Sequence, residues 1–155
     1  MYIISACLCG VNCKYNGGNN YNKVCSDLFE EGKAIIICPE QLGGLSTPRI
    51  PSELTNTALN VINGHNGKVI SKEGNDVTKN FISGANEAVD IAKRLGIKLA
   101  ILKDGSPSCG VNYIYDGTFT GEKIKGVGLT TQMLKDIGVK VINEDNVGGE
   151  LSEYI

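Results

Sequence analysis

Four short aliphatic runs, separated by segments with helical periodicity, constrain the fold of this chain more than any other feature. The runs cover residues 2–6, 33–38, 98–102 and 139–142. The intervening segments expected to be helical are residues 22–31, 76–95 and 126–137. Short buried strands that alternate with helices are typical of a parallel sheet covered on both faces. We therefore expect an α/β fold, a mostly parallel sheet with helices on both faces in a Rossmann-like three-layer arrangement.

Small antiparallel additions to this sheet are also expected. Residues 58–71 are predicted to form a β-hairpin insertion, because Asn-Gly between apolar runs favours a tight turn. His65 would lie at the exposed tip of that turn. A second short pairing is expected within residues 113–119, and the loop 41–53 has a length typical of functional segments.

Length and charge narrow the class of protein. The chain has 155 residues, so we expect residues 1–155 to form a single domain. The formal net charge of −2 provides no basic field for nucleic acid. No apolar run approaches the roughly 20 residues that span a bilayer, and the first residues lack the pattern of a signal peptide. A cytoplasmic protein with no membrane partner is expected, and the sequence does not indicate its oligomeric state.

The chain carries six cysteines, which are many for a domain in a reducing compartment. Metal binding or thiol chemistry therefore explains them better than a disulfide framework. The chain has only one histidine, so the ligands of a metal site would be mainly cysteine thiolates. Thiolate ligands favour zinc or an iron–sulfur cluster. The spacing matches neither the paired knuckles of zinc ribbons nor the close cysteine runs of ferredoxins, so it does not name the metal.

Three of these cysteines follow the predicted strands. Cys7 and Cys38 come directly after the first two, and Cys109 lies in the loop after the third. Because the carboxyl ends of parallel strands meet at one edge of a sheet, where open α/β folds bind ligands, the three thiols are expected to converge.

Five motifs occur in order along the chain. They are Ser5-Ala-Cys-Leu; Cys38-Pro-Glu; Gly43-Gly-Leu with Pro48-Arg-x-Pro51; Gly74-x-Asp-Val-Thr-x-x-Phe; and Leu102-Lys-x-x-Ser-Pro-Ser-Cys-Gly110. Together they resemble the family once filed as domain of unknown function 523, which includes thiouracil desulfidases. The likeness covers nearly the whole chain. Lys14-Tyr-Asn-Gly17 replaces the more usual Arg-Tyr-Asp-Gly, and Cys9, Cys13 and Cys25 are additions to the family pattern.

The resemblance implies a [4Fe-4S] cluster held by Cys7, Cys38 and Cys109, with one iron lacking a protein ligand. It also implies a non-redox reaction in which that open iron binds the sulfur of thiouracil or a thiouridine nucleotide. Water would attack the adjacent ring carbon, releasing the uracil or uridine form and hydrogen sulfide. Glu40 and Ser106 are the residues expected to assist the water.

Arg49, Ser108 and Lys103 are expected to contact the substrate. In the alternative arrangement Glu40 only pairs with Arg49, Ser106 is a turn hydroxyl and Lys103 is solvated. Two other functions fit the same residues, a cluster-based sulfur carrier and a structural zinc domain. A small thiolated pyrimidine is the expected partner, and thiolated tRNA stays open as an alternative. Whether Cys9 or Cys13 adds a ligand is also left open.

Overall fold

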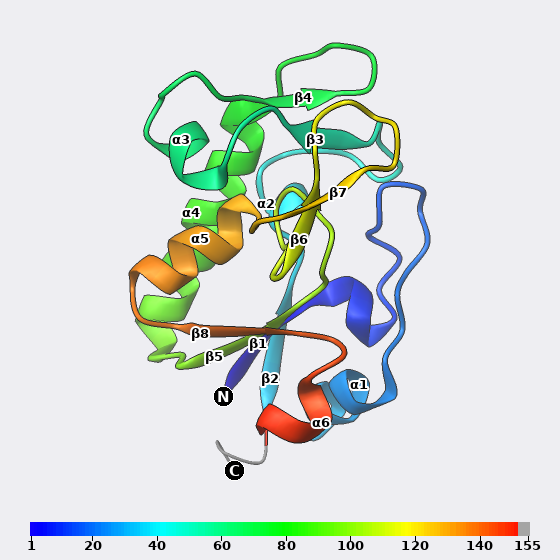
Figure 1. Cartoon of the computed structure of the whole chain (residues 1–155). Coiled ribbons are helices and arrows are strands. Elements are labelled where there is room, and N and C mark those ends of the chain that lie inside the picture. Colours follow the sequence, from blue (N-terminus) through cyan, green and yellow to red (C-terminus); the bar gives the residue numbers. More distant parts are fainter. Residues whose placement is uncertain (152–155) are drawn as a thin grey trace.

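The centre of the molecule is a four-stranded parallel sheet, shown by a computed structural model that describes residues 1–151 (Figure 1). The strand order is β2-β1-β5-β8. The strands are β1 (Tyr2–Ser5), β2 (Ala34–Ile37), β5 (Leu99–Leu102) and β8 (Lys140–Asn143). All three pairings between them are parallel, so the sheet predicted from the four aliphatic runs is confirmed.

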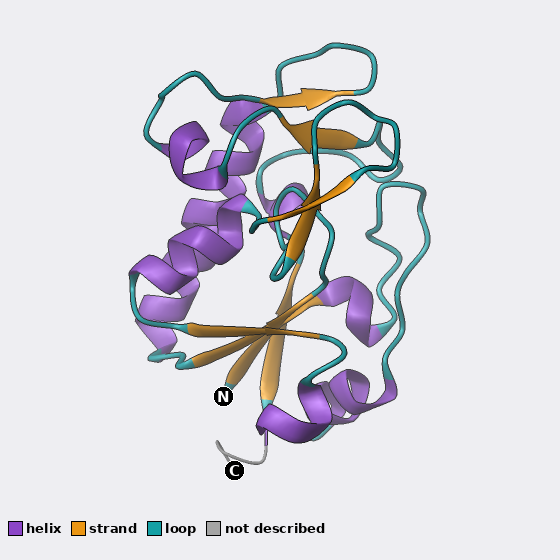
Figure 2. Ribbon diagram, in the orientation of Figure 1, coloured by secondary structure: helices purple, strands orange, loops and turns teal. Residues whose placement is uncertain are grey.

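Helices cover both faces of this sheet and complete three layers (Figure 2). One face carries α4 (Thr78–Leu95) and α5 (Leu129–Asp136), and the other carries α1 (Lys23–Glu30) and α6 (Val147–Glu150). Ile3 and Ile4 are both fully buried, because consecutive strand residues point to opposite faces and each face has its own helix layer. No helix in the described part of the chain is long and apolar enough to cross a bilayer.

The helix ends follow local chemistry. Asn22 caps α1, its side-chain oxygen accepting the N–H of Cys25 at 3.1 Å. Asp76, the predicted N-cap of α4, is one residue early, because Val77 occupies the cap position. Asp76 lies before the cap position and accepts the N–H of Thr78 at 3.0 Å, while Gly96, with a φ of 61°, ends the helix as expected.

The antiparallel additions differ from the prediction. They comprise β3 (Ser52–Leu54), α3 (Ala58–Ile62), β4 (Val69–Ser71), β6 (Tyr113–Tyr115) and β7 (Lys123–Lys125). The hairpin over residues 58–71 is wrong, because Thr57 accepts the N–H of Asn60 and caps a short helix instead. Its second half, β4, pairs with β3. The pairing that begins at Tyr113 is confirmed, but its partner strand is β7.

Two short helices start where central strands end. The 3₁₀ helix η1 (Ala6–Cys9) continues directly from β1. A single residue, Cys38, separates β2 from α2 (Pro39–Leu42). Pro39 has no N–H to give to a sheet ladder, so it suits the first turn of a helix at this strand end. Both helices thus place a cysteine at the carboxyl edge of the sheet.

Candidate metal centre and active site

A pocket with a volume of about 550 Å³ opens at the carboxyl edge of the central sheet. Cys7 in η1, Cys38 at the N-cap of α2 and Cys109 in the loop after β5 all line it. The structure therefore brings together the three thiols that topology predicted to converge. Cys13, from the loop after η1, lines the same pocket.

Asp104 organises the loop that carries Cys109. The residue is 4% exposed, and its Oδ2 accepts a hydrogen bond from Asn143 Nδ2 at 3.0 Å. Its Oδ1 accepts four backbone N–H groups, those of Gly105, Val111, Asn112 and Tyr113. Burial alone would raise the pKa of Asp104, but these hydrogen bonds hold it below its usual value. Asp104 was not predicted as a site residue, although an acidic residue between a buried strand and a glycine was an available signal.

Ser106 links the Cys109 loop to α2. Its Oγ accepts the N–H groups of Ser108 at 3.0 Å and Cys109 at 3.1 Å, as a turn hydroxyl does. The same hydroxyl donates to Glu40 Oε1 at 3.2 Å. Ser106 therefore holds the backbone at Cys109 and the carboxylate of Glu40 at once.

Ser108 does not line the pocket, contrary to the expected substrate contact. It is fully buried, and its Oγ shares a 2.8 Å hydrogen bond with Thr130 Oγ1 at the start of α5. The hydroxyl is turned toward the helix layer because the loop packs against that helix. We therefore do not assign Ser108 to substrate binding.

Glu40 and Arg49 form an ion pair at the pocket wall. Arg49 donates to Glu40 Oε2 from Nε at 2.8 Å and from Nη2 at 2.5 Å, and the two side chains are only 8% (Arg49) and 15% (Glu40) exposed. The pairing foreseen as an alternative is thus present, and it coexists with the Ser106 contact. Because Glu40 partly neutralises Arg49, the guanidinium is not a free anchor for an anionic substrate.

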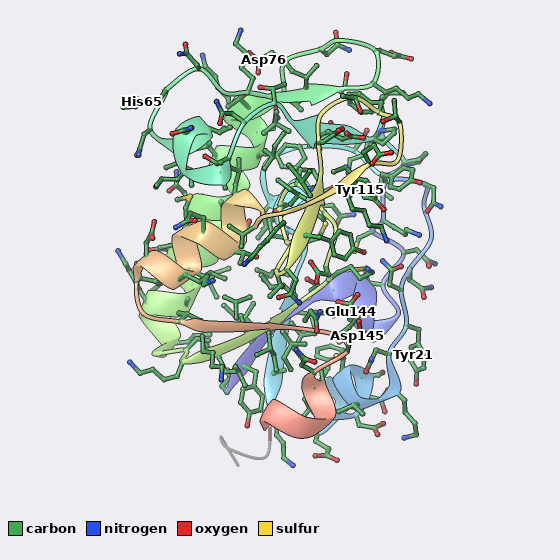
Figure 3. The ribbon with its side chains drawn as sticks, in the orientation of Figure 1. Tyr21, His65, Asp76, Tyr115, Glu144 and Asp145 are labelled. Carbon is green, nitrogen blue, oxygen red and sulfur yellow. The ribbon has the colours of Figure 1, made fainter. Side chains whose placement is uncertain are left out.

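Lys103 lines the pocket and is not a solvated lysine. Its Nζ pairs with Glu144 Oε1 at 2.8 Å and donates to the carbonyl oxygen of Asp104 at 3.0 Å. Burial alone would lower the pKa of Lys103, but the Glu144 carboxylate raises it above its ordinary value. Figure 3 labels Glu144 at the end of β8 and places His65 far away in the insertion.

The thiols of the pocket differ in acidity. A hydrogen bond from Cys13 lowers the pKa of Cys38 to about 7, with help from the N–H of Gln41. A hydrogen bond from Cys13 also lowers the pKa of Cys7, whereas burial raises that of Cys109. Since the thiolate is the form that binds metals, Cys7 and Cys38 are prepared for ligation.

Cys9 and Cys25 lie outside the pocket, on the face covered by α1. The Cys9 thiol donates to the carbonyl oxygen of Cys25 at 3.4 Å. Burial raises the pKa of Cys9 to about 11 and that of Cys25 to about 12. Their position and protonated thiols are those of core residues.

Within residues 1–151, no group of three His, Cys, Asp or Glu side chains is arranged to hold a single metal ion. The thiols of Cys7, Cys38 and Cys109 nevertheless line one pocket. A multi-iron cluster can use such a set of ligands, because each thiolate binds a separate iron.

Aromatic side chains also line the pocket. They include Tyr15, Tyr113, Tyr115 and Phe119, which were not predicted from the sequence because they come from separate loops and short strands. Glu53 Oε1 accepts the N–H of Phe119 at 3.2 Å, which ties the loop after β6 to β3. Flat aromatic side chains in a pocket that also carries polar groups and thiols are suited to a planar ring.

Comparison with known proteins identifies relatives of the whole chain. Residues 2–146 match the 2-thiouracil desulfurase family. The Bacillus subtilis (strain 168) protein YbbK is 43% identical over 148 residues, which cover 95% of this chain and 97% of that protein. A solved structure, the [4Fe-4S]-dependent thiouracil desulfidase TudS, matches with a TM-score of 0.87 and 38% identity, covering 99% of this chain and 95% of the other. The resemblance inferred from the five motifs is confirmed.

Proposed function

This chain belongs to the 2-thiouracil desulfurase family, and on that premise we propose that it uses a [4Fe-4S] cluster to remove sulfur from a thiolated pyrimidine. The products would be the corresponding uracil form and hydrogen sulfide, with water supplying the oxygen. The observation that carries the proposal is the meeting of three strand-end thiols with Glu40 and Ser106 in one pocket.

The donor set fits such a cluster. Cys7, Cys38 and Cys109 would hold it, since thiolates are the usual ligands of iron–sulfur clusters. Arg49 and Lys103 line the same pocket, and their positive charges reduce the repulsion among the thiolates. When bound through three thiolates, the cluster would supply a coordinatively open iron, a Lewis acid with affinity for a thiocarbonyl sulfur.

Glu40 is the proposed proton acceptor for the attacking water. Its carboxylate lies at the pocket wall, two residues beyond Cys38, and Arg49 and Ser106 fix both oxygens. A base held in one orientation removes a proton efficiently when water is placed within hydrogen-bond reach. The proton taken up there would return to the departing sulfur, so the reaction needs no external electron donor.

The proposed substrate position is between the sulfur-lined wall and the aromatic side of the pocket. A pyrimidine ring is planar, and Tyr113 and Tyr115 form an edge-to-face pair with centroids 6.2 Å apart on that side. Lys103 and Arg49 are each already paired with a carboxylate, so we assign them to charge balance and to the orientation of Glu40 rather than to direct substrate capture.

Anaerobic reconstitution with iron and sulfide, followed by a hydrogen sulfide assay, tests the proposal. The protein is expected to release sulfide from 2-thiouracil, 4-thiouracil or their nucleotides. Glu40→Gln should keep the cluster absorption and lose turnover by about 10²–10⁴-fold, the usual contribution of a general base. Glu30→Gln, an exposed carboxylate outside the pocket, is the matched control and should change neither.

The outcomes separate the alternatives. Unchanged turnover in Glu40→Gln would remove Glu40 from the mechanism. A protein that takes up sulfide on its cluster without turnover would be a sulfur carrier. Sulfide uptake should then be the same in Glu40→Gln, because a carrier does not require Glu40. A colourless protein with one zinc and no iron would be a structural zinc domain.

A further inference from the structure

Phe119 holds a backbone conformation that its residue type rarely adopts. It lies in the loop between β6 and β7, lines the pocket and has a φ of 58°. The left-handed region is costly for a bulky side chain, so a residue found there is held by its surroundings. Asn66, the other non-glycine residue with a positive φ among residues 1–151, is of a type that tolerates this conformation.

Glu53 in β3 supplies the restraint on Phe119. Its Oε1 accepts the backbone N–H of Gly117 at 2.9 Å and that of Phe119 at 3.2 Å. Hydrogen bonds to a carboxylate are stronger than those between neutral groups. The two backbones also lie close together, since a Cβ atom at Gly117 would be 2.7 Å from the carbonyl oxygen of Leu54. One strand residue thus fastens the loop to β3 at Phe119 and two residues before it.

The tyrosines of the pocket already have partners for their rings. Lys123 Nζ lies over the ring of Tyr113, 4.7 Å from its centroid, and the same ring forms the edge-to-face pair with Tyr115. Lys14 Nζ lies 5.9 Å from the centroid of the Tyr15 ring. These contacts occupy part of the surface that each ring could offer to a ligand.

The two phenylalanines of the pocket differ from each other. Phe81 is 2% exposed and belongs to the apolar cluster between α4 and its neighbours, so its ring is part of the core. Phe119 is only half-buried, and no ring or cation in the described part of the chain contacts its ring. Phe119 is therefore an apolar ring fixed at the pocket with its surface still available.

Resting on the proposed function, we infer that Phe119 stacks on the pyrimidine ring of the substrate and that Glu53 is the positioning residue that holds it there. A pyrimidine base is planar, and it gains affinity from an aromatic side chain against its face. The substrate and the uracil product have the same flat ring, so this contact strengthens binding without assisting the chemical step. Phe119 and Glu53 therefore act on KM and leave kcat nearly unchanged.

Kinetics of sulfide release from 2-thiouracil and calorimetric titration with uracil, both on the anaerobically reconstituted protein, test the inference. Phe119→Ala should raise KM and the Kd for uracil by about 5–150-fold, the usual contribution of one stacked base. Glu53→Ala should change both in the same direction. Glu53→Gln, whose side-chain oxygen can still accept both N–H groups, should restore most of the affinity. Glu122→Ala, an exposed carboxylate of the same loop outside the pocket, is the control and should change neither.

The double variant Glu53→Ala/Phe119→Ala separates positioning from a general structural role. Because Glu53 acts through the ring of Phe119, its loss should add nothing once that ring is gone. The double variant should then have the KM and Kd of Phe119→Ala, and all variants should keep the iron content of the wild type. Effects that multiply in the double variant, or wild-type values in Phe119→Ala, would overturn the inference.

Replacement variants keep the test open where a protein fails to fold. Phe119→Leu keeps the apolar bulk without a flat ring, and Glu53→Asp withdraws the carboxylate from the loop. Failure of the proposed function is distinguishable, because the wild-type protein would then release no sulfide, while the titration with uracil still measures the contribution of Phe119.

Discussion

Arg49 connects the acidic and the sulfur-bearing walls of the pocket at the scale of a single residue. Arg49 donates to Glu40 and, from Nη2, to the Cys13 carbonyl oxygen at 2.8 Å. It also donates to Thr47 Oγ1 at 2.9 Å and to the Ser46 carbonyl oxygen at 3.3 Å. A guanidinium presents several donors in one plane, so few other side chains could satisfy all of these acceptors. Loss of Arg49 would leave the Glu40 carboxylate without its charged partner in a largely desolvated place.

Arg49→Met should therefore lower the free energy of unfolding by about 3–5 kcal/mol, the usual effect of removing one partner of a buried ion pair. The measurement is urea denaturation of the cluster-free protein. Arg94→Met is the matched control, because Arg94 pairs with Asp90 on the surface, where side chains are 77% and 56% exposed. Its effect should stay below about 1 kcal/mol. Equal, small losses in both variants would contradict the structural role given to Arg49.

The carboxylate of Asp104 should make the free energy of unfolding depend on pH. Its pKa in the folded protein is lowered, so its stabilising effect is complete above the unfolded value of about 3.9 and is lost as the pH falls through the folded value. Asp104→Asn, whose amide would face the Asn143 donor, should cost about 1.5–3 kcal/mol at pH 7. The difference from wild type in urea denaturation should shrink below about pH 4.

The control for Asp104 is Asp145→Asn, an exposed carboxylate close by at the end of β8 (Figure 3). Its stability should follow that of the wild type at both pH values. A difference for Asp104→Asn that is independent of pH would show that the charge of the carboxylate does not hold the Cys109 loop.

At the scale of elements, the close approach of α2 to α4 positions both Cys38 and Glu40. Gly43, just after α2, and Gly84, within α4, face each other's backbone. A Cβ atom at Gly84 would lie 1.8 Å from the Pro39 carbonyl oxygen, and one at Gly43 would lie 2.0 Å from that of Asn80. Only glycine permits this contact, because backbone atoms cannot move aside as a flexible side chain does.

Gly84→Ala should push α2 away from α4 and reduce both stability and cluster retention. Overpacking of this kind costs about 1–3 kcal/mol, and the displaced helix carries the residue next to Cys38. Thermal unfolding and iron content after gel filtration measure the two effects. Gly148→Ala, where a Cβ meets no atom within 4 Å, should alter neither. Full iron retention in Gly84→Ala would mean that the α2 position does not matter to the cluster.

The central elements were predictable because their signals are local. Each strand of the parallel sheet is a continuous aliphatic run, and parallel pairing then fixes which edge receives Cys7, Cys38 and Cys109. The hairpin predicted over residues 58–71 is wrong, because the prediction followed the Asn-Gly turn signal and not the capping residue Thr57. Thr57 starts a helix of only five residues. Short apolar segments of this kind fit a helix or a strand equally well.

The contacts within the site were only partly predictable. Ser106 and Glu40 are 66 positions apart, so their hydrogen bond depends on tertiary packing. The same is true of the Asn143 contact with Asp104 and of the Arg49 contact with the Cys13 carbonyl oxygen. Residue type pointed to the chemistry of the site, but the partners of each residue follow from how the loops fold over the sheet edge.

At the scale of the whole molecule, the fold divides its tasks between two regions. The sheet and its helix layers bury the apolar side chains and fix the strand ends, while β3, β6 and the neighbouring loops add further residues to the lining of the pocket. Figure 1 shows the short β3–β4 and β6–β7 pairs set apart from the central sheet. The strand ends thus present the thiols from a rigid sheet, and the loops supply the other residues of the pocket. We propose that this set of thiols holds one iron–sulfur cluster.

Iron analysis of the anaerobically reconstituted protein and its single serine variants tests that claim most directly. We predict about four iron atoms per chain in the wild type, the content of one [4Fe-4S] cluster, and loss of most of them in Cys7→Ser, Cys38→Ser and Cys109→Ser. Cys9→Ser and Cys25→Ser should retain the full content. Iron retained in all three pocket variants, or one zinc per chain in place of iron, would contradict the account.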